Sequence, residues 1–196
     1  MALTLTFCGV STFFIFCYMY GEKMNEECYK IAQSIVVELL DRGCSVSTAE
    51  SCTGGGIAAS LTAVPGSSAC VKGGVVAYAE EVKMSVLGVL DETLRTFGVV
   101  SQEVVVEMAR GVMRLLGTDF AVATSGVAGP TGGTEAVPVG TIWIAVVSHN
   151  EESTYCIRSY DEGRKKNTQH AVLEALGQLQ KMIENEENQG EGQIND

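Results

Sequence analysis

The order of strand-like and helical segments restricts the fold more than any other feature of the sequence. Three runs have the apolar or alternating pattern of β-strands, and helical segments separate them: "CSVSTAE" at 44–50, "KGGVVAY" at 72–78 and "DFAVATS" at 119–125. Two further apolar runs, 141–148 and 153–160, flank a short polar turn and indicate a hairpin. Strands interleaved with helices are typical of a parallel sheet covered on both faces, to which the hairpin adds antiparallel pairing. We therefore expect an α/β fold, a three-layer α/β/α sandwich with a mixed, mostly parallel sheet.

Helical periodicity and end signals complete this expectation. Residues 25–42 place their apolar side chains on one helix face, and Gly43 is suited to end that helix. Ser101 is a predicted N-cap for the long segment that follows it. The other predicted helices are a segment from about Thr53 to Ala63, two short pieces near 80–88 and 91–98, and a final helix from about Arg164 to Met182.

Length and apolar content indicate one folded domain with extensions at both ends. The chain has 196 residues, enough for a single core. We expect the domain to span 24–183. It would start at Met24 because this residue opens a complete amphipathic helix. Residues 184–196 are acidic and almost without apolar side chains, so we expect them to form a disordered tail. Residues 1–23 are expected to lie outside the fold. Their uncharged run 2–21 is long enough to cross a bilayer, so a membrane anchor remains the alternative, whereas a signal peptide would need basic residues before the run.

Charge and cysteine usage exclude several classes of function. The formal net charge is −11, and nucleic-acid binding needs clustered Lys and Arg, so no nucleic-acid partner is expected. The seven cysteines form no C-x-x-C pair and the chain has only two histidines, which argues against a zinc site and against a disulfide framework. We expect no metal and reduced thiols in a cytoplasmic protein.

Ser51 is the first candidate for a reactive group. It stands in "TAESCTGGG", 48–56, between a predicted strand and a predicted helix, where free N–H groups could stabilise an anion. The segment is neither a Walker A motif nor the G-x-S-x-G elbow of the α/β-hydrolases. Ser51 is also a suitable helix cap, so both interpretations stay open at this point. Cys52 is a rival nucleophile, although a thiol at this position is more often packed in a core.

A serine nucleophile needs a base, and the best candidate in the sequence is a lysine. Lys83 follows the second predicted strand at the start of a short helix, and a lysine acts as a base only when its pKa is lowered. The alternative is a solvated surface lysine. Tyr78, at the end of the same strand, could relay a proton or could be a half-buried strand aromatic.

The third predicted strand also ends in polar residues, Thr124 and Ser125, before a glycine-rich loop. Ligands of open α/β sheets bind beyond the carboxyl ends of the strands. Three strands with polar, glycine-flanked ends therefore predict one site at one edge of the sheet, which favours a functional role for Ser51 over a capping role.

At these segments the chain resembles the CinA C-terminal-domain family. The resemblance covers about 24–182, and the matching segments are "AESCTGG" (49–55), "GGVVAY" (73–78) with Lys83, "GVVS" (98–101), "ATSGVAGPTGG" (123–133) and "PVGTIWIA" (138–145). It implies an α/β/α fold, a homodimer or higher homo-oligomer, no metal or cofactor, and deamidation of nicotinamide mononucleotide. It also implies Ser51 as the nucleophile, with Tyr78 and Lys83 handling protons.

On this resemblance we expect the substrate contacts to come from three segments. Backbone N–H groups near Thr53 to Gly55 would hold the oxyanion, and the strand end would contribute to substrate binding; the predicted substrate-binding residues are Thr53, Gly54, Gly55, Thr124, Ser125, Gly126 and Arg164.

The chain departs from the family pattern in three ways. It lacks the separate molybdopterin-binding-like domain of longer members, it has Ala79-Glu80 where members usually have Ser-Asn, and it has Thr168 where a second arginine is usual. The last difference leaves Arg164 and helix N-termini to hold a phosphate. A non-catalytic nucleotide-binding or partner-binding domain is the alternative function.

Overall fold

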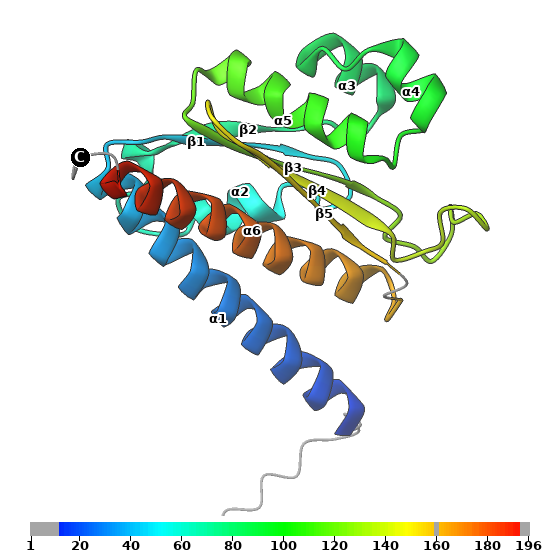
Figure 1. Ribbon diagram of the computed structural model, residues 1–196. Coiled ribbons are helices and arrows are strands. Elements are labelled where there is room, and N and C mark those ends of the chain that lie inside the picture. Colours follow the sequence, from blue (N-terminus) through cyan, green and yellow to red (C-terminus); the bar gives the residue numbers. More distant parts are fainter. Residues whose placement is uncertain (1–11, 159–160, 193–196) are drawn as a thin grey trace, which may run out of the picture.

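A five-stranded sheet forms the centre of the computed structural model (Figure 1), which describes residues 12–158 and 161–192, with side chains described for 26–158 and 161–186. The strands are β1 (Val46–Glu50), β2 (Val71–Val76), β3 (Phe120–Gly126), β4 (Ile142–Val147) and β5 (Glu152–Ile157). Their order across the sheet is β2-β1-β3-β4-β5. β1 pairs in parallel with β2 and β3, whereas β4 runs antiparallel to both β3 and β5. The mixed sheet predicted from the sequence is confirmed.

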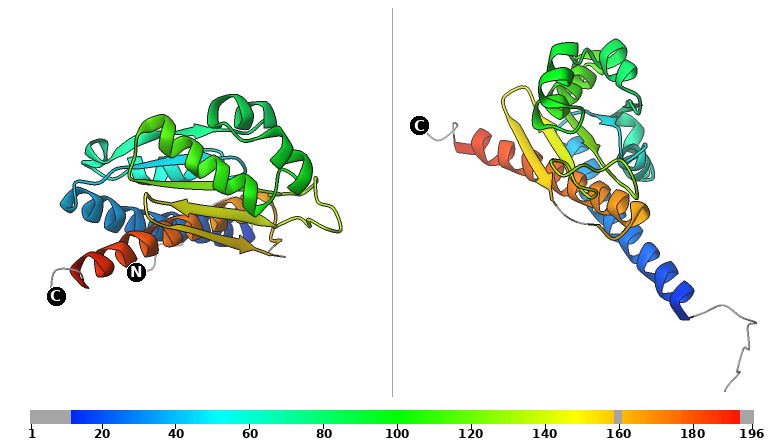
Figure 2. Two further views of the ribbon diagram at one scale, coloured as in Figure 1. Left: turned by 45° about the horizontal axis from the view of Figure 1, so that its top comes forward. Right: turned by 90° about the vertical axis from the view of Figure 1, so that its right-hand side faces the viewer.

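Helices cover both faces of the sheet and complete three layers (Figures 1 and 2). One face carries α1 (Thr12–Asp41), α2 (Gly56–Thr62) and α6 (Arg164–Gly192). The other carries α3 (Glu80–Leu87), α4 (Asp91–Phe97) and α5 (Gln102–Leu116). A short 3-10 helix, Ser67–Ala69, leads into β2. Ser101 caps α5 as expected, with its side chain accepting from the N–H of Val104 at 3.4 Å.

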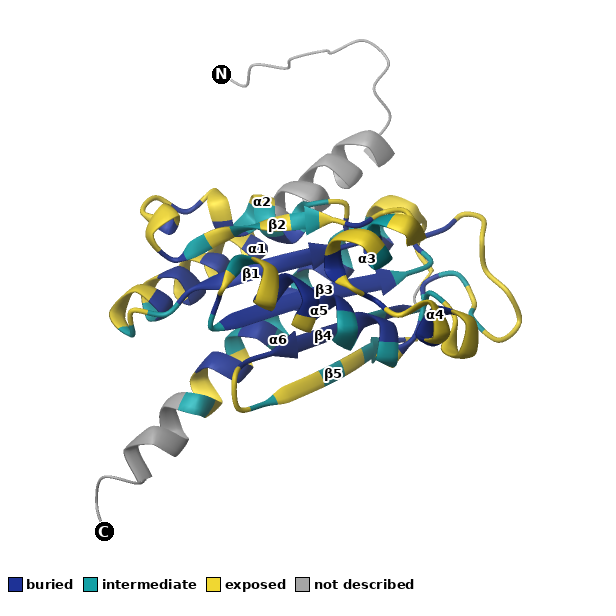
Figure 3. Cartoon of the chain, turned by 90° about the horizontal axis from the view of Figure 1, so that it is seen from above, coloured by how far each residue is buried: buried dark blue, intermediate teal, exposed yellow. Residues whose placement is uncertain are grey.

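Two apolar clusters, one on each face of the sheet, hold the layers together. The inner strands β1, β3 and β4 are buried, whereas the edge strands β2 and β5 are partly exposed (Figure 3). Successive side chains along a strand alternate between the two faces. On β4, Ile144 packs in the cluster beneath α1 and α6, while its neighbour Ala145 packs in the cluster beneath α5. Fully burying one Leu or Ile side chain contributes about 1.5–3 kcal/mol, so these clusters supply most of the stabilisation.

Close pairing of β1 and β2 depends on a glycine. A Cβ atom at Gly74 would lie 2.2 Å from the side-chain oxygen of Thr48 on β1. Any larger residue at this position would force the Thr48 side chain or the backbone of β2 to shift. Since β1 and β2 both lead into the candidate site, the glycine fixes their relative position.

Several element boundaries differ from those expected. α2 begins at Gly56, not near Thr53, because Gly54 and Gly55 adopt φ values of +63° and +97° that are incompatible with a helix. β2 ends at Val76, so Tyr78 follows the strand instead of belonging to it.

Both ends of the folded chain also differ from the expectation. α1 begins at Thr12, upstream of the predicted start. α6 continues to Gly192, through residues expected to be a disordered tail from 184 onwards. The physical reason lies at Glu186, which accepts a hydrogen bond from Ser148 and lies 3.9 Å from Arg42, so this part of the tail is packed.

The apolar run 2–21 lies outside the residues whose side chains are described. Among the helices that are described, none combines the length and the apolar character needed to cross a bilayer.

Candidate active site

The three polar strand ends predicted to converge do converge. β1, β2 and β3 are neighbouring parallel strands, so their carboxyl ends lie at one edge of the sheet. A cavity of about 200 Å³ opens there. It is lined by Ser51, Cys52, Tyr78, Glu80, Lys83, Val99, Val100, Ser125, Gly126, Ala128 and Arg164.

Ser51 leaves the end of β1 and is held in place by the neighbouring strand. Its N–H donates to the carbonyl of Thr124 on β3 at 3.0 Å, and the residue is 8% exposed. Ser51 does not cap α2, because the N-cap of that helix is Gly55, four residues later. The capping interpretation is therefore wrong, and the hydroxyl faces the cavity.

Lys83 reaches the serine from α3 and is almost completely buried. Only 1% of its surface is exposed, so the interpretation as a solvated surface lysine is wrong. Its Nζ donates to Ser51 Oγ at 3.0 Å and to the carbonyl of Ala77 at 2.6 Å. Burial lowers the pKa of Lys83 from its ordinary value of 10.5, because the charged ammonium loses its hydration, although the negative charge of Glu80 partly opposes this. The arrangement is that of an amine suited to accept a proton from the serine.

The thiol of Cys52 lies beside Ser51 but is unsuited to act as a nucleophile. The residue is buried, and burial raises the pKa of the thiol to about 12. A thiol with this pKa is protonated at neutral pH, and only the thiolate is strongly nucleophilic. The burial of the Cys52 thiol therefore favours Ser51 as the nucleophile.

Tyr78 and Arg164 form a bridge at the edge of the cavity. The guanidinium of Arg164, at the start of α6, donates to the Tyr78 hydroxyl at 2.6 Å and to the carbonyl of Gly129 at 3.1 Å. Tyr78 is 61% exposed, so the expectation of a half-buried strand aromatic is wrong. Both side chains are accessible to a ligand that enters the cavity.

The glycines after Ser51 do not face the cavity, contrary to expectation. The N–H of Gly54 donates to the carbonyl of Ser51 at 3.2 Å, and that of Gly55 donates to the carboxylate of Glu50 at 3.0 Å. Thr53 and Thr124 also lie away from the cavity lining, because their hydroxyls bond to each other at 2.7 Å. Of the predicted substrate contacts, Ser125, Gly126 and Arg164 are brought to the cavity with Ser51.

Glu50 is a buried residue of the site that sequence reasoning missed. It is fully buried, and its carboxylate accepts three N–H groups at the start of α2, from Gly55, Ile57 and Ala58 at 2.8–3.1 Å. This carboxylate occupies the N-terminus of α2, which therefore cannot hold a substrate anion as expected. The signal available in the sequence was a carboxylate directly before a predicted helix N-terminus.

Two other polar side chains hold the walls of the cavity. Ser125 donates from its hydroxyl to the carbonyl of Val99 at 2.7 Å, which attaches the loop before α5 to β3. Asn167, only 1% exposed, donates to the carbonyl of Ala128 at 2.9 Å. Sequence reasoning missed Asn167, because a single amide in a helix gives no signal of its contacts with a distant loop.

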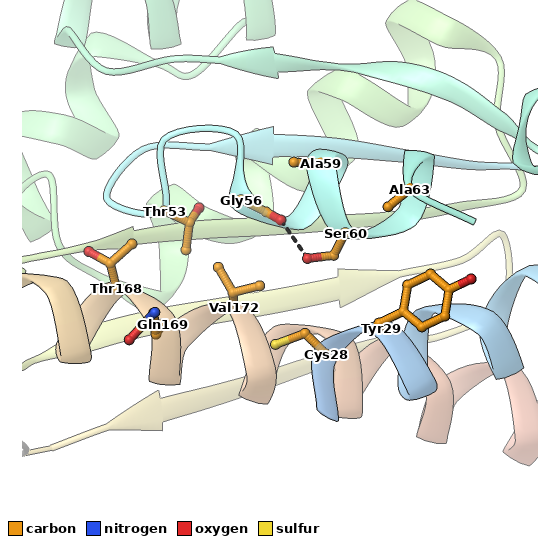
Figure 4. A pocket seen from close by; sticks show the side chains of 10 residues that line it. All are labelled: Cys28, Tyr29, Thr53, Gly56, Ala59, Ser60, Ala63, Thr168, Gln169 and Val172. Atoms are coloured by element: carbon orange, nitrogen blue, oxygen red, sulfur yellow. Dashed lines mark hydrogen bonds between the residues drawn. The ribbon is translucent and has the colours of Figure 1, made fainter. Parts of the chain in front are cut away.

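A second, larger cavity of about 380 Å³ is lined by residues of α1, α2 and α6 and by Thr53 (Figure 4). Thr53 and Thr168 point into it, as do Cys28 and Val172. None of the ten described residues that line it is charged. It therefore provides neither a nucleophile with a base nor a positive charge for a phosphate.

Comparison with known proteins identifies relatives over most of the chain. The sequence pattern of the family described as the CinA C-terminal domain matches residues 28–183. A CinA-like protein of Fervidobacterium nodosum is 47% identical over 143 residues, which are 69% of this chain and 35% of that protein, so the chain spans about a third of this relative. The nicotinamide-nucleotide amidohydrolase PncC of Escherichia coli is 40% identical over 82% of this chain and 98% of its own length. The crystal structure of the competence/damage-inducible protein CihA from Agrobacterium tumefaciens has a TM-score of 0.77 at 41% identity, covering 78% of this chain and 93% of that one.

Proposed function

The chain belongs to the CinA C-terminal domain family, and on that premise we propose that it hydrolyses the carboxamide of nicotinamide mononucleotide to give nicotinate mononucleotide and ammonia. The relationship to an amidohydrolase of nicotinamide nucleotides along nearly the whole of that enzyme supports this substrate. The observation that carries the proposal is the 3.0 Å contact between Ser51 Oγ and the buried amine of Lys83. A hydroxyl beside a desolvated amine is a nucleophile with its base.

In the first step, Ser51 Oγ attacks the carboxamide carbon while Lys83 takes its proton. The lysine must be neutral for this, and burial favours the neutral form by lowering its pKa. At 3.0 Å the serine hydroxyl can donate to the neutral amine, while the carbonyl of Ala77 keeps accepting an N–H from the same nitrogen. The lysine is thus oriented before the substrate arrives.

The developing oxyanion needs N–H donors that the protein does not already use. The amides of Gly54 and Gly55 are engaged, whereas those of Cys52 and Thr53 make no hydrogen bond to another described residue. Of these two residues, Cys52 lines the cavity, so we assign the oxyanion to the N–H of Cys52, which directly follows the nucleophile. One such donor lowers the barrier by about 3 kcal/mol in other acyl-transfer sites.

Expulsion of ammonia requires a proton on the leaving nitrogen. Arg164 donates to the oxygen of Tyr78, so the phenol hydrogen remains free to point into the cavity. In this proposal Tyr78 carries the proton taken up by Lys83 to the leaving nitrogen. Water then attacks the acyl-serine, with Lys83 again accepting a proton, and releases the carboxylate and the serine.

The cavity accommodates only the reacting end of the nucleotide. Its volume of about 200 Å³ is below the ~300–1000 Å³ typical of sites that enclose a whole ligand. The ribose and phosphate therefore extend past Tyr78 toward the guanidinium of Arg164. Among the described residues that line the cavity, Arg164 is the positively charged one that is exposed at its edge.

We also propose that the protein is a homo-oligomer, as the family resemblance implies. Light scattering after size-exclusion chromatography tests this proposal.

The decisive experiment measures ammonia release from nicotinamide mononucleotide by the unaltered protein and by Ser51→Ala. We expect the variant to stay folded, because Ser51 caps no helix, and to lose activity by several orders of magnitude. Mass spectrometry of the unaltered protein should detect an acyl adduct on Ser51. Near-normal turnover by folded Ser51→Ala would overturn the serine mechanism. Nucleotide binding without ammonia release by the unaltered protein would establish the non-catalytic alternative.

A further inference from the structure

We propose that Glu80 makes the site selective for substrates in which the reacting ring is a pyridinium cation. The inference rests on the proposed function, since it concerns recognition at the same cavity. Nicotinamide gains a fixed positive charge when its ring nitrogen is attached to ribose, and a substrate of this kind carries that charge a few atoms from the scissile carboxamide. A carboxylate beside the reacting group would attract it.

The position of Glu80 separates it from the other acidic residues nearby. Glu80 is the first residue of α3 and lines the cavity together with Ser51 and Lys83. Glu81 stands in the same first turn but is not among the lining residues. A carboxylate at either position stabilises the helix by its negative charge near the N-terminus. Helix stability alone therefore does not explain why one of the two lines the cavity.

The carboxylate of Glu80 is available to a ligand. It makes no hydrogen bond or ion pair with any other residue that the structure describes at side-chain level. Tyr78 lies beside it at the cavity, 61% exposed, and an exposed aromatic face also favours a cation. One anion and one aromatic ring are therefore arranged at the place where the ring of the substrate must enter.

The charges around the cavity match a substrate that carries charges of both signs. Glu80 comes from α3, and the guanidinium of Arg164 comes from the start of α6 and also lines the cavity. Nicotinamide mononucleotide has a cationic ring at one end and an anionic phosphate at the other. A site with only positive charge would hold the phosphate but repel the ring.

Glu80 also acts on the base, which gives the inference a second readout. Its negative charge raises the pKa of Lys83, against the larger opposite effect of burial. The other ionisable groups that line the cavity around this lysine are Cys52, Tyr78 and Arg164. Removing the charge of Glu80 should therefore move the acid limb of the pH–rate profile to lower pH, because Lys83 then loses its proton more easily.

The test compares Glu80→Gln with Glu81→Gln, which removes the same charge from the neighbouring position. Each is made in the Ser51→Ala background, and calorimetry measures binding of nicotinamide mononucleotide in two forms. The oxidised form has the pyridinium charge, whereas the reduced dihydropyridine form keeps the carboxamide, ribose and phosphate without it. We expect Glu80→Gln to weaken binding of the oxidised form by about twofold to fivefold, as for a partly exposed ion pair, and to leave the reduced form unchanged. Glu81→Gln should change neither.

Equal weakening of both forms by Glu80→Gln, or weakening of neither, would overturn the inference. In the active protein, Glu80→Gln should move the acid limb of the pH–rate profile to lower pH, while Glu81→Gln should leave it in place. An unmoved limb in Glu80→Gln would also count against the proposed role of Glu80. Absence of ammonia release from the unaltered protein would refute the proposed function. The binding comparison would still decide whether Glu80 recognises the ring charge.

Discussion

The contact between α3 and α5 sets the position of the proposed base, and Gly111→Ala tests this. A Cβ atom at Gly111 on α5 would lie 2.0 Å from the carbonyl oxygen of Leu87 at the end of α3. Because Cβ atoms in proteins essentially never approach such an atom within 3.0 Å, the two helices must move apart by about 1 Å. Lys83 moves with α3, and its 3.0 Å contact with Ser51 lengthens beyond hydrogen-bonding range.

The expected magnitudes follow from this displacement. In Gly111→Ala, overpacking should lower the free energy of unfolding by about 1–3 kcal/mol. The better helix propensity of alanine should raise it by about 1 kcal/mol. A misplacement of about 1 Å reduces kcat by about 100-fold. Gly177→Ala in α6 is the matched control, since its Cβ would meet nothing within 4 Å and the variant gains only the helix propensity.

Thermal unfolding and steady-state kinetics of the two variants provide the assay. The melting temperature of Gly111→Ala should lie about 2–12 °C below that of Gly177→Ala, for a difference of about 1–3 kcal/mol. Its kcat should fall while that of Gly177→Ala stays unchanged. If the two variants melt together and turn over at the same rate, α3 is not held by this contact and the reasoning is refuted.

Three further predictions concern the charges of the site. Lys83→Met should reduce kcat nearly as much as Ser51→Ala, and the rate of the unaltered protein should rise with pH along a limb below 10.5, because the pKa of Lys83 is lowered by burial. Between the lowered pKa of Lys83 and 10.5, the unfolded state binds one proton more than the folded state, so the free energy of unfolding rises with pH across this window. Lys83→Met should remove this rise when the free energy of unfolding is measured by chemical denaturation at several pH values. An unchanged slope of the free energy against pH would show that Lys83 is not the group responsible. Arg164→Ala should raise KM for the mononucleotide more than it lowers kcat, since its guanidinium is exposed at the cavity edge, and initial-rate kinetics with an unchanged KM would exclude contact with the phosphate.

The sequence predicted the layers and the location of the site because both depend on local patterns. Apolar strand runs and helical periodicity determine which segments become β1 to β5 and which become helices. Parallel neighbouring strands then bring polar residues at their carboxyl ends to one edge, which is how Ser51 and Ser125 reach the same cavity. These conclusions need no knowledge of side-chain contacts.

The state of each side chain in the site could not be predicted in this way. Lys83 has the sequence context of a surface residue, and only its contact with the carbonyl of Ala77 and the packing around α3 show that it is buried. The amides of Gly54 and Gly55 were misassigned because each already has a partner in the same loop, the carbonyl of Ser51 and the carboxylate of Glu50. The burial of Lys83 depends on tertiary packing, which overrides what a local pattern indicates.

The long separation between Ser51 and Lys83 ties reactivity to the completed fold. The two residues are 32 positions apart, and they meet only after β1 and β2 have paired in parallel and α3 has packed on α5. In the unfolded chain the amine is hydrated and protonated, and the serine is an ordinary alcohol. A reagent that acylates Ser51 through this mechanism would therefore count native molecules, and the extent of its reaction along a denaturation curve would measure the folded fraction at the active site itself.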